Sequence, residues 1–306
     1  MTTPAASSDV WTTRRLLVWM GEAFTKKGLD SPRLMAEMLV AHVVGCERLK
    51  LYMDPDRPAS PLERETLRDL VGRALKHEPV QYLVGEAWFF GLPFKVDPRV
   101  LIPRPATETI VQEVLQHQRA TRGAGAKGDG VLIADVCTGS GCIAISLLKN
   151  LPEARVAASD ISETALELAR ENAVRHGVVE RLDLLRGDML GPLLEHPATR
   201  GSPSLDYLVS NPPYIPDDEW DGVAPNVKDH EPHAALRGGA DGLDLVRPLL
   251  RDGPRLVKSG GLLLVEVADS RATEAAELFA GEAALKDVRV LTDFEGLPRV
   301  VCATKV

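Results

Sequence analysis

The sequence predicts a doubly wound α/β domain that follows a small helical domain and a β-hairpin linker. From residue 131 onward, strand-like and helix-like segments alternate, which is typical of a parallel sheet covered by helices. Residues 9 to about 78 instead repeat apolar positions at intervals of three and four, as amphipathic helices do. We therefore assign residues 1–78 to the helical domain, 79–105 to the linker and 106–306 to the α/β domain.

The helical domain carries two sequence signals for helix starts. Ser60-Pro61-Leu62-Glu63 combines a capping serine, a proline in the first turn and a glutamate at the capping-box position. Asp30-Ser31-Pro32 places another capping side chain before a proline. In the linker, apolar and aromatic residues alternate with Gly and Pro, which favours short strands joined by tight turns.

The elements of the α/β domain follow from the length and pattern of the apolar runs. The sequence predicts helices over 107–118, 142–150, 162–176 and 241–257 and strands over 131–136, 155–160, 182–185, 205–210, 262–268, 288–291 and 299–303. In such a sheet, ligands bind at the carboxyl ends of the strands. The residues that follow each predicted strand are therefore the candidates for a functional site.

Composition and charge restrict the class of partner. The chain has 306 residues, 36 basic and 44 acidic side chains and a net charge of −8. Residues 1–85 hold 12 basic and 11 acidic side chains, against 24 basic and 33 acidic in residues 86–306. Proteins that hold nucleic acid by neutralising phosphates are normally basic, so we expect no stable nucleic-acid binding.

Cysteine spacing and hydropathy indicate the compartment. Cys46, Cys137, Cys142 and Cys302 form no C-x-x-C pair and no zinc-type spacing with histidine. The N-terminus lacks the pattern of a signal peptide, and no run approaches the roughly 20 apolar residues that a membrane span needs. We expect a cytoplasmic monomer with reduced thiols, no membrane contact and no metal site.

A glycine-rich turn follows the first strand of the α/β domain, in the run 135–142, Asp-Val-Cys-Thr-Gly-Ser-Gly-Cys. Glycines allow close approach of a ligand to the backbone, and the N-terminus of the following helix attracts electronegative groups. A nucleotide-like cofactor explains this loop, although a tight structural turn would also explain it.

Carboxylates follow the second and third strands. Asp160 ends the second strand, where a carboxylate can accept hydrogen bonds from both ribose hydroxyls of a nucleotide-like cofactor. Capping of the next helix, by Asp160 or by Ser162, is the structural alternative. After the third strand, Asp188 could accept from an adenine amino group with Met189 against the ring, or both could belong to a polar turn.

The most informative motif, Asn211-Pro212-Pro213-Tyr214, follows the strand 205–210. Two prolines hold the backbone rigid and leave their carbonyls as acceptors beside the Asn211 amide. The Asn211 side-chain oxygen and the Pro212 carbonyl can each accept one N–H of a planar NH₂ group, which Tyr214 would cover. A rigid turn without a ligand is the structural alternative.

These motifs resemble those of class I S-adenosylmethionine methyltransferases, and more narrowly the protein-(glutamine-N5) methyltransferases, among which the release factor branch is most similar. The resemblance also includes Pro79-Val80-Gln81-Tyr82-Leu83, Phe90-Gly91-Leu92-Pro93-Phe94, Leu101-Ile102-Pro103-Arg104-Pro105 with Thr107-Glu108, Asp229-His230-Glu231-Pro232, Gly238-Gly239 and Asp241-Gly242-Leu243. Cys137, Met189 and Ala268 depart from the residues usual in the family.

The resemblance implies a Rossmann-like fold, S-adenosylmethionine as the methyl donor, and N5-methylation of a glutamine in peptide chain release factors. The implied cofactor-binding residues are Asp135, Cys137, Thr138, Gly139, Ser140, Gly141, Asp160, Asp188, Met189 and Asn211. The implied catalytic residues are Asn211, Pro212 and Tyr214, and the implied substrate-binding residues are Asn211, Pro212, Pro213 and Tyr214. The helical domain would recognise the substrate protein.

Other functions stay open at this point. Glutamine methylation of a ribosomal protein fits the same motifs, and Cys137 with the segment 86–89 leans toward it. Methylation of an exocyclic amine of a nucleic acid base would use the same Asn-Pro-Pro-Tyr chemistry but normally requires a basic surface. A nicotinamide-dependent oxidoreductase would use the glycine-rich loop and Asp160 yet leave that motif unexplained. In a non-catalytic binding module, the motif would do no chemistry.

Overall fold

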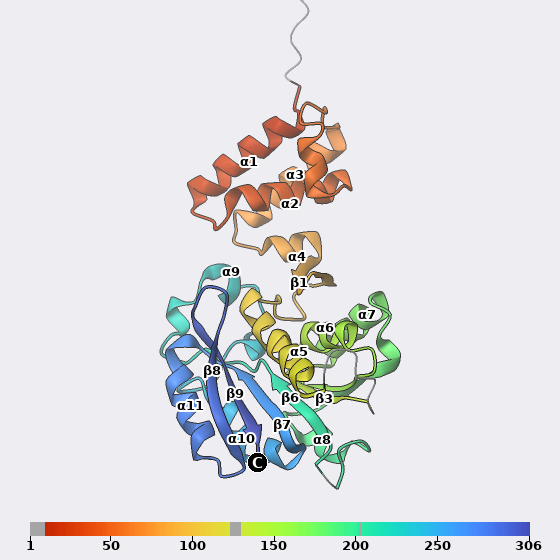
Figure 1. The fold of residues 1–306 in the computed structure, drawn as a ribbon. Coiled ribbons are helices and arrows are strands. Elements are labelled where there is room, and N and C mark those ends of the chain that lie inside the picture. The colour runs from red at the N-terminus through yellow and green to blue at the C-terminus, as the bar shows by residue number, and fades with distance from the viewer. Residues whose placement is uncertain (1–9, 123–129, 202) are drawn as a thin grey trace, which may run out of the picture. The chain divides into compact units, whose positions relative to one another are not determined.

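A computed structural model describes residues 10–122, 130–201 and 203–306 and divides the chain into two compact units (Figure 1). The helical unit comprises the chain up to Gly85 together with Pro225–His230. The α/β unit comprises Glu86–Ala224 and Glu231–Val306. The helical unit is therefore built from two separate stretches of sequence.

The helical unit contains one apolar core, to which its helices up to residue 84 contribute. Its helices are α1 (Thr13–Lys27), α2 (Pro32–Val44), α3 (Pro61–Ala74), α4 (Val80–Val84) and α9 (Pro225–Lys228). Met20 and Phe24 of α1 pack with Leu39 of α2 and Leu67 of α3, all of them buried. The helical periodicity of the sequence thus correctly predicts the buried face.

One of the two predicted helix caps is present. Ser60 accepts from the backbone N–H of Glu63 while the Glu63 carboxylate accepts from that of Ser60, a complete capping box. Ser31 makes no capping hydrogen bond, because its backbone lies in the left-handed region with φ of 48°. The predicted cap at Ser31 is wrong, although Pro32 does begin the helix α2.

The predicted hairpin segment 79–105 contains both a helix and a hairpin. Pro79 precedes the short helix α4, whose residues Val80 and Leu83 are buried in the core of the helical unit. The antiparallel strands β1 (Glu86–Phe89) and β2 (Leu92–Lys95) follow, so the hairpin is shorter than the predicted segment. Burial of apolar side chains by the preceding helices favours helix at 80–84 over strand.

The α/β unit is built on a seven-stranded sheet with the strand order β5-β4-β3-β6-β7-β9-β8. Its strands are β3 (Leu132–Val136), β4 (Arg155–Asp160), β5 (Leu182–Arg186), β6 (Leu205–Ser210), β7 (Val257–Glu266), β8 (Leu285–Thr292) and β9 (Pro298–Lys305). The first five in spatial order are parallel, whereas β9 runs antiparallel to both β7 and β8. This arrangement confirms the predicted doubly wound α/β fold with two closing strands.

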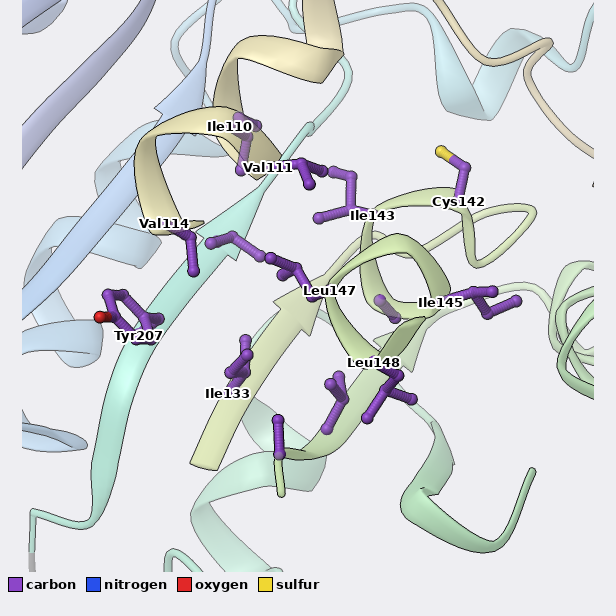
Figure 2. Packing of buried hydrophobic residues seen from close by; sticks show 14 of the residues in the cluster. Ile110, Val111, Val114, Ile133, Cys142, Ile143, Ile145, Leu147, Leu148 and Tyr207 are labelled. Carbon is purple, nitrogen blue, oxygen red and sulfur yellow. The ribbon is translucent and has the colours of Figure 1, made fainter. Parts of the chain in front are cut away.

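Helices cover both faces of this sheet. They are α5 (Glu108–Arg122), α6 (Cys142–Asn150), α7 (Glu163–Arg175), α8 (Gly191–Glu195), α10 (Val246–Asp252) and α11 (Ala272–Gly281). Figure 2 shows Ile110 and Val114 of α5 and Leu147 of α6 packing over Ile133 and Tyr207 of the strands. The alternate strand residues, such as Ala134 and Leu208, face a second core that α8, α10 and α11 complete. Burial on both faces explains the continuous apolar runs in the sequence.

Two features of the C-terminal part differ from the prediction. The predicted helix 241–257 is reduced to α10, because Gly253 and Pro254 form a 3-10 turn and Val257 already begins β7. The helix α11 lies in a region for which the sequence predicts no element.

Within the described residues, no helix is long and apolar enough to cross a membrane.

Candidate active site

Three neighbouring strands end at one edge of the sheet. Val136 at the end of β3 pairs with Ser159 of β4 on one side and with Ser210 of β6 on the other. The chain leaves β3 toward β4 and β5 and later returns to the opposite side of β3 as β6, which makes this edge a topological switch point. The sequence-predicted motifs after these three strands therefore converge.

The glycine-rich loop after β3 needs its glycines for two reasons. Gly139 has φ of 54° and donates its backbone N–H to the Asp160 carboxylate at 2.9 Å. Gly141 has φ of 79° and begins α6 so close to α7 that a Cβ atom would lie 3.3 Å from that of Ala169. The loop therefore combines a half-buried backbone turn at Gly139 with a tight packing point between two helices at Gly141.

Asp135 accepts hydrogen bonds from this loop and from the first turn of α6. Its side chain is fully buried, and one carboxylate oxygen accepts from the Thr138 hydroxyl at 2.7 Å and from the Ala144 N–H at 3.2 Å. The other oxygen has no hydrogen-bond partner among the described residues. Burial raises the pKa of Asp135 to about 7, whereas the hydrogen bonds from Thr138 and Ala144 lower it.

Asp160 joins the end of β4 to the same loop. One carboxylate oxygen accepts from Gly139 and the other from the backbone N–H of Ser162 at 2.9 Å. Burial raises the pKa of Asp160, and the backbone N–H donors lower it. Ser162 itself caps α7 by accepting from Ala165, so helix capping does not account for Asp160. Each oxygen keeps capacity for a further donor such as a ribose hydroxyl.

The residues after β5 lie close to the glycine-rich loop. Met189 has φ of 47°, and its carbonyl accepts from the Ser159 hydroxyl at 3.0 Å. Its sulfur lies 3.9 Å from the Cys137 sulfur, so two residues that depart from the family pattern are in contact. Burial raises the pKa of the Cys137 thiol, which favours a neutral packing residue over a thiolate nucleophile. Asp188 is exposed in the same turn.

The Asn-Pro-Pro-Tyr segment presents an unused acceptor. The Asn211 side-chain nitrogen donates to the Thr107 hydroxyl at 3.1 Å, whereas its oxygen is buried and has no partner among the described residues. Pro212 and Pro213 are buried and Tyr214 is half-buried. A Cβ atom at Gly238 would lie 2.7 Å from the Cα of Tyr214, so the glycine lets a second backbone segment approach this motif.

Two buried acidic residues near this motif were absent from the predicted site. Glu266 ends β7 and is fully buried, and neither of its carboxylate oxygens has a hydrogen-bond partner among the described residues. Burial raises its pKa to about 7, while the nearby Thr107 and Tyr214 hydroxyls lower it. A charged residue closing the apolar run 262–265 is the sequence signal that could have indicated it.

Glu231 is the second of these buried acids. It forms an ion pair with Arg104 and accepts from the backbone N–H of Ile102 at 3.1 Å. Burial raises its pKa, whereas Arg104 lowers it. The pair joins two of the motifs that carry the family resemblance, at 101–105 and 229–232.

Comparison with known proteins identifies the family. The N-terminal part matches the model described as the PrmC N-terminal domain over residues 15–85, and the model described as the methyltransferase small domain matches residues 121–225. The release factor glutamine methyltransferase of Chlorobaculum tepidum is 41% identical over 290 residues, which cover 95% of this chain and 96% of that protein. The chain belongs to the release factor glutamine methyltransferase family.

Other relatives agree. The release factor glutamine methyltransferase of Geobacter sulfurreducens is 39% identical over 96% of both chains. Among solved structures, the release factor-specific protein-(glutamine-N5) methyltransferase of Alicyclobacillus acidocaldarius aligns at 29% identity over 69% of this chain and 99% of that chain, with a TM-score of 0.40. Family membership rests on the sequence relatives.

The residues of this site fit the methyl donor of the family, S-adenosylmethionine. Asp160 and the loop at Gly139 carry carboxylate and backbone groups of the kind that can bind a ribose, and Asp188 and Met189 lie in the turn after the neighbouring strand β5. The buried acids Asp135 and Glu266 suit a cationic sulfonium. In the described part of the chain, no three His, Cys, Asp or Glu residues are grouped as metal ligands.

Proposed function

We propose that this protein transfers a methyl group from S-adenosylmethionine to the side-chain nitrogen of a glutamine in a peptide chain release factor. The observation that carries the proposal is the free, buried oxygen of Asn211 at the switch point, in a chain with full-length relatives named for that reaction. The free thiols of all four cysteines fit a reducing cytoplasm as its location.

Positioning by Asn211 and Pro212 is the core of the proposed mechanism. The Asn211 oxygen and the Pro212 carbonyl each accept one N–H of the glutamine amide and fix its plane. Tyr214 covers one face, so the nitrogen can attack only from the other. The sulfonium of S-adenosylmethionine supplies the electrophilic methyl group when bound. Because the Asn211 oxygen is already desolvated, little reorganisation accompanies substrate binding.

An amide nitrogen is a poor nucleophile because its lone pair is delocalised into the carbonyl. Holding two reactants in near-attack geometry can lower the barrier by about 7–11 kcal/mol. The two acceptors also stabilise the positive charge that develops on nitrogen, an effect that is strong in a site without water. The proton then leaves a cationic nitrogen, which is acidic, so the mechanism needs no strong base.

Mass spectrometry tests this proposal directly. The protein is incubated with isotope-labelled S-adenosylmethionine and, in parallel, with purified release factors, ribosomal proteins and tRNA. We expect one methyl group on one glutamine of a release factor. Label on a ribosomal protein alone, or on RNA alone, would replace the proposed substrate by one of these alternatives.

A single substitution tests the role of Asn211. We expect Asn211→Ala to lower kcat by at least about 100-fold, because it removes an acceptor that faces the reacting nitrogen. Affinity for S-adenosylhomocysteine, measured by calorimetry, should stay within about threefold if the cofactor contacts are mainly those of Asp160 and the loop. Turnover at the wild-type rate would contradict the proposed clamp.

A further inference from the structure

Glu266 has no role in the mechanism above, yet it lies directly beside the groups that act in it. Its carboxylate is fully buried and lacks a hydrogen-bond partner among the described residues. The Thr107 and Tyr214 hydroxyls are close enough to favour its charged form. A buried carboxylate beside two hydroxyls is costly unless they bond to it at some stage of the reaction cycle.

Thr107 connects Glu266 to Asn211. The Thr107 side chain is buried, and its oxygen accepts from the Asn211 side-chain nitrogen at 3.1 Å. A hydroxyl has one proton to donate, and that proton cannot point at a group that is itself donating. The Glu266 carboxylate, close enough to feel the Thr107 hydroxyl, is an acceptor whose oxygens have no other partner among the described residues. Once the Thr107 hydroxyl turns to it, the order of donation runs from Asn211 to Thr107 and from Thr107 to Glu266.

This order determines which atom Asn211 presents to a substrate. An asparagine amide has a donor end and an acceptor end, and rotation by 180° exchanges them. Only with its nitrogen held by Thr107 does the oxygen face the substrate amide. In the opposite orientation, the NH₂ group of Asn211 would face the NH₂ group of the substrate glutamine, and neither could accept. The placement of the substrate amide for reaction therefore depends on the direction of the Thr107 hydroxyl.

We propose that Thr107 and Glu266 are positioning residues that hold the Asn211 amide in the orientation that accepts the substrate N–H. The proposal rests on the proposed function of Asn211 and adds residues that do not touch the reacting atoms. When protonated, Glu266 can instead donate to the Thr107 oxygen and compete with Asn211 for it. The charged form of Glu266 thus supports the productive orientation.

The groups around Glu266 set its pKa near neutral pH. Burial raises its pKa to about 7, and Thr107, Tyr214, Arg299 and Arg104, in order of decreasing effect, lower it. The Cys142 thiol also feels the charge of Glu266, which raises the pKa of that thiol. Activity should therefore rise as Glu266 loses its proton near neutral pH.

The first test compares two substitutions of Thr107. Thr107→Val keeps the shape but removes the hydroxyl, and we expect kcat to fall by roughly 10- to 100-fold. KM should change by less than about threefold, because a protein substrate makes most of its contacts elsewhere. Thr107→Ser restores the hydroxyl and should recover kcat to within about threefold of wild type. Thr121→Val removes an exposed hydroxyl that bonds to His117 and serves as the matched control.

The second test uses Glu266→Gln and a signal that needs no substrate. The variant should lose the rise in kcat near neutral pH that the wild type shows. In ¹⁵N-labelled protein, the side-chain NH₂ signals of Asn211, identified by their absence in Asn211→Ala, should exchange faster with solvent in Thr107→Val than in Thr107→Ser.

The outcomes separate this inference from the proposed function. Wild-type protein that leaves every release factor glutamine unmethylated overturns the proposed function. Wild-type protein that methylates while Thr107→Val keeps its kcat, or while Glu266→Gln keeps the pH profile, overturns the positioning role alone. Thermal denaturation of each variant identifies any loss that comes from unfolding.

Discussion

At the scale of single residues, the titration of Asp135 makes the free energy of unfolding depend on pH. Its carboxyl has a pKa of about 7 in the folded chain, raised by burial, against an ordinary value of 3.8. Between these values the folded state holds a proton that the unfolded state has lost. The free energy of unfolding therefore falls as pH rises from about 4 to about 7, by up to about 1.4 kcal/mol per pH unit.

Asp135→Asn should remove this contribution. The amide oxygen can still accept from Thr138 and Ala144, and the amide nitrogen takes the position of the oxygen that has no partner. Urea denaturation at pH 5.5 and pH 7.5 should show that the wild type loses more stability than the variant over this interval, by roughly 1–3 kcal/mol. Equal losses in both proteins would refute the raised pKa.

Asp160 is the residue on which cofactor affinity should depend most. Asn at this position offers one acceptor, so its NH₂ group would face the N–H of either Gly139 or Ser162. We expect Asp160→Asn to weaken S-adenosylhomocysteine binding by roughly 10- to 100-fold, since it loses charge-assisted hydrogen bonds. Calorimetry measures this change, with Asp69→Asn on the exposed face of α3 as the control. Unchanged affinity would remove Asp160 from the predicted cofactor site.

The residues of the site differ in how far the sequence predicts them. Asp160 ends one apolar strand and Asn211 directly follows another, so their convergence at one sheet edge follows from the parallel topology alone. Glu266 and Thr107 meet only in the folded chain, since one ends β7 and the other precedes α5. Nothing in their separate sequence contexts relates them. The predicted roles of the individual residues in binding and catalysis stay predictions.

At the scale of elements, two serines with similar sequence context illustrate the limit of local signals. Both stand before a proline that begins a helix, yet only Ser60 makes the capping bonds. The difference is the backbone of Ser31, which lies in the left-handed region and makes no capping hydrogen bond. The glutamate three residues after Ser60 is the signal that Ser31 lacks.

The two serines predict opposite outcomes for one substitution. Ser60→Ala should lower the free energy of unfolding by about 1 kcal/mol, the usual contribution of an N-cap side chain. Ser31→Ala should change it by less than about 0.5 kcal/mol, because no capping bond is lost. Urea denaturation of the full chain, followed by far-UV circular dichroism, measures both. Equal losses would show that the capping box contributes nothing specific.

At the scale of the whole molecule, sequence order hides part of the domain organisation. Pro225–His230 belongs to the helical unit although it lies between strands of the α/β unit. The His230 ring nitrogen lies 3.3 Å from the Lys76 carbonyl, which illustrates how the segment joins that unit. A boundary drawn at one point along the chain, as at residue 78, cannot represent a unit assembled from two segments.

The charge of the α/β unit leads to the last prediction. Residues 86–306 carry 33 acidic and 24 basic side chains, and these acidic residues include the buried Asp135 and Glu266 and the half-buried Asp160. Phosphates would be repelled by this unit, whereas a cationic methyl donor is favoured. We expect fluorescently labelled RNA and duplex DNA to bind with a Kd above about 10⁻⁴ M at physiological salt, weaker than ordinary non-specific binding. Fluorescence anisotropy measures this, with a lysine-rich peptide as the positive control. A Kd below about 10⁻⁵ M that weakens steeply with salt would favour a nucleic acid substrate over a protein one.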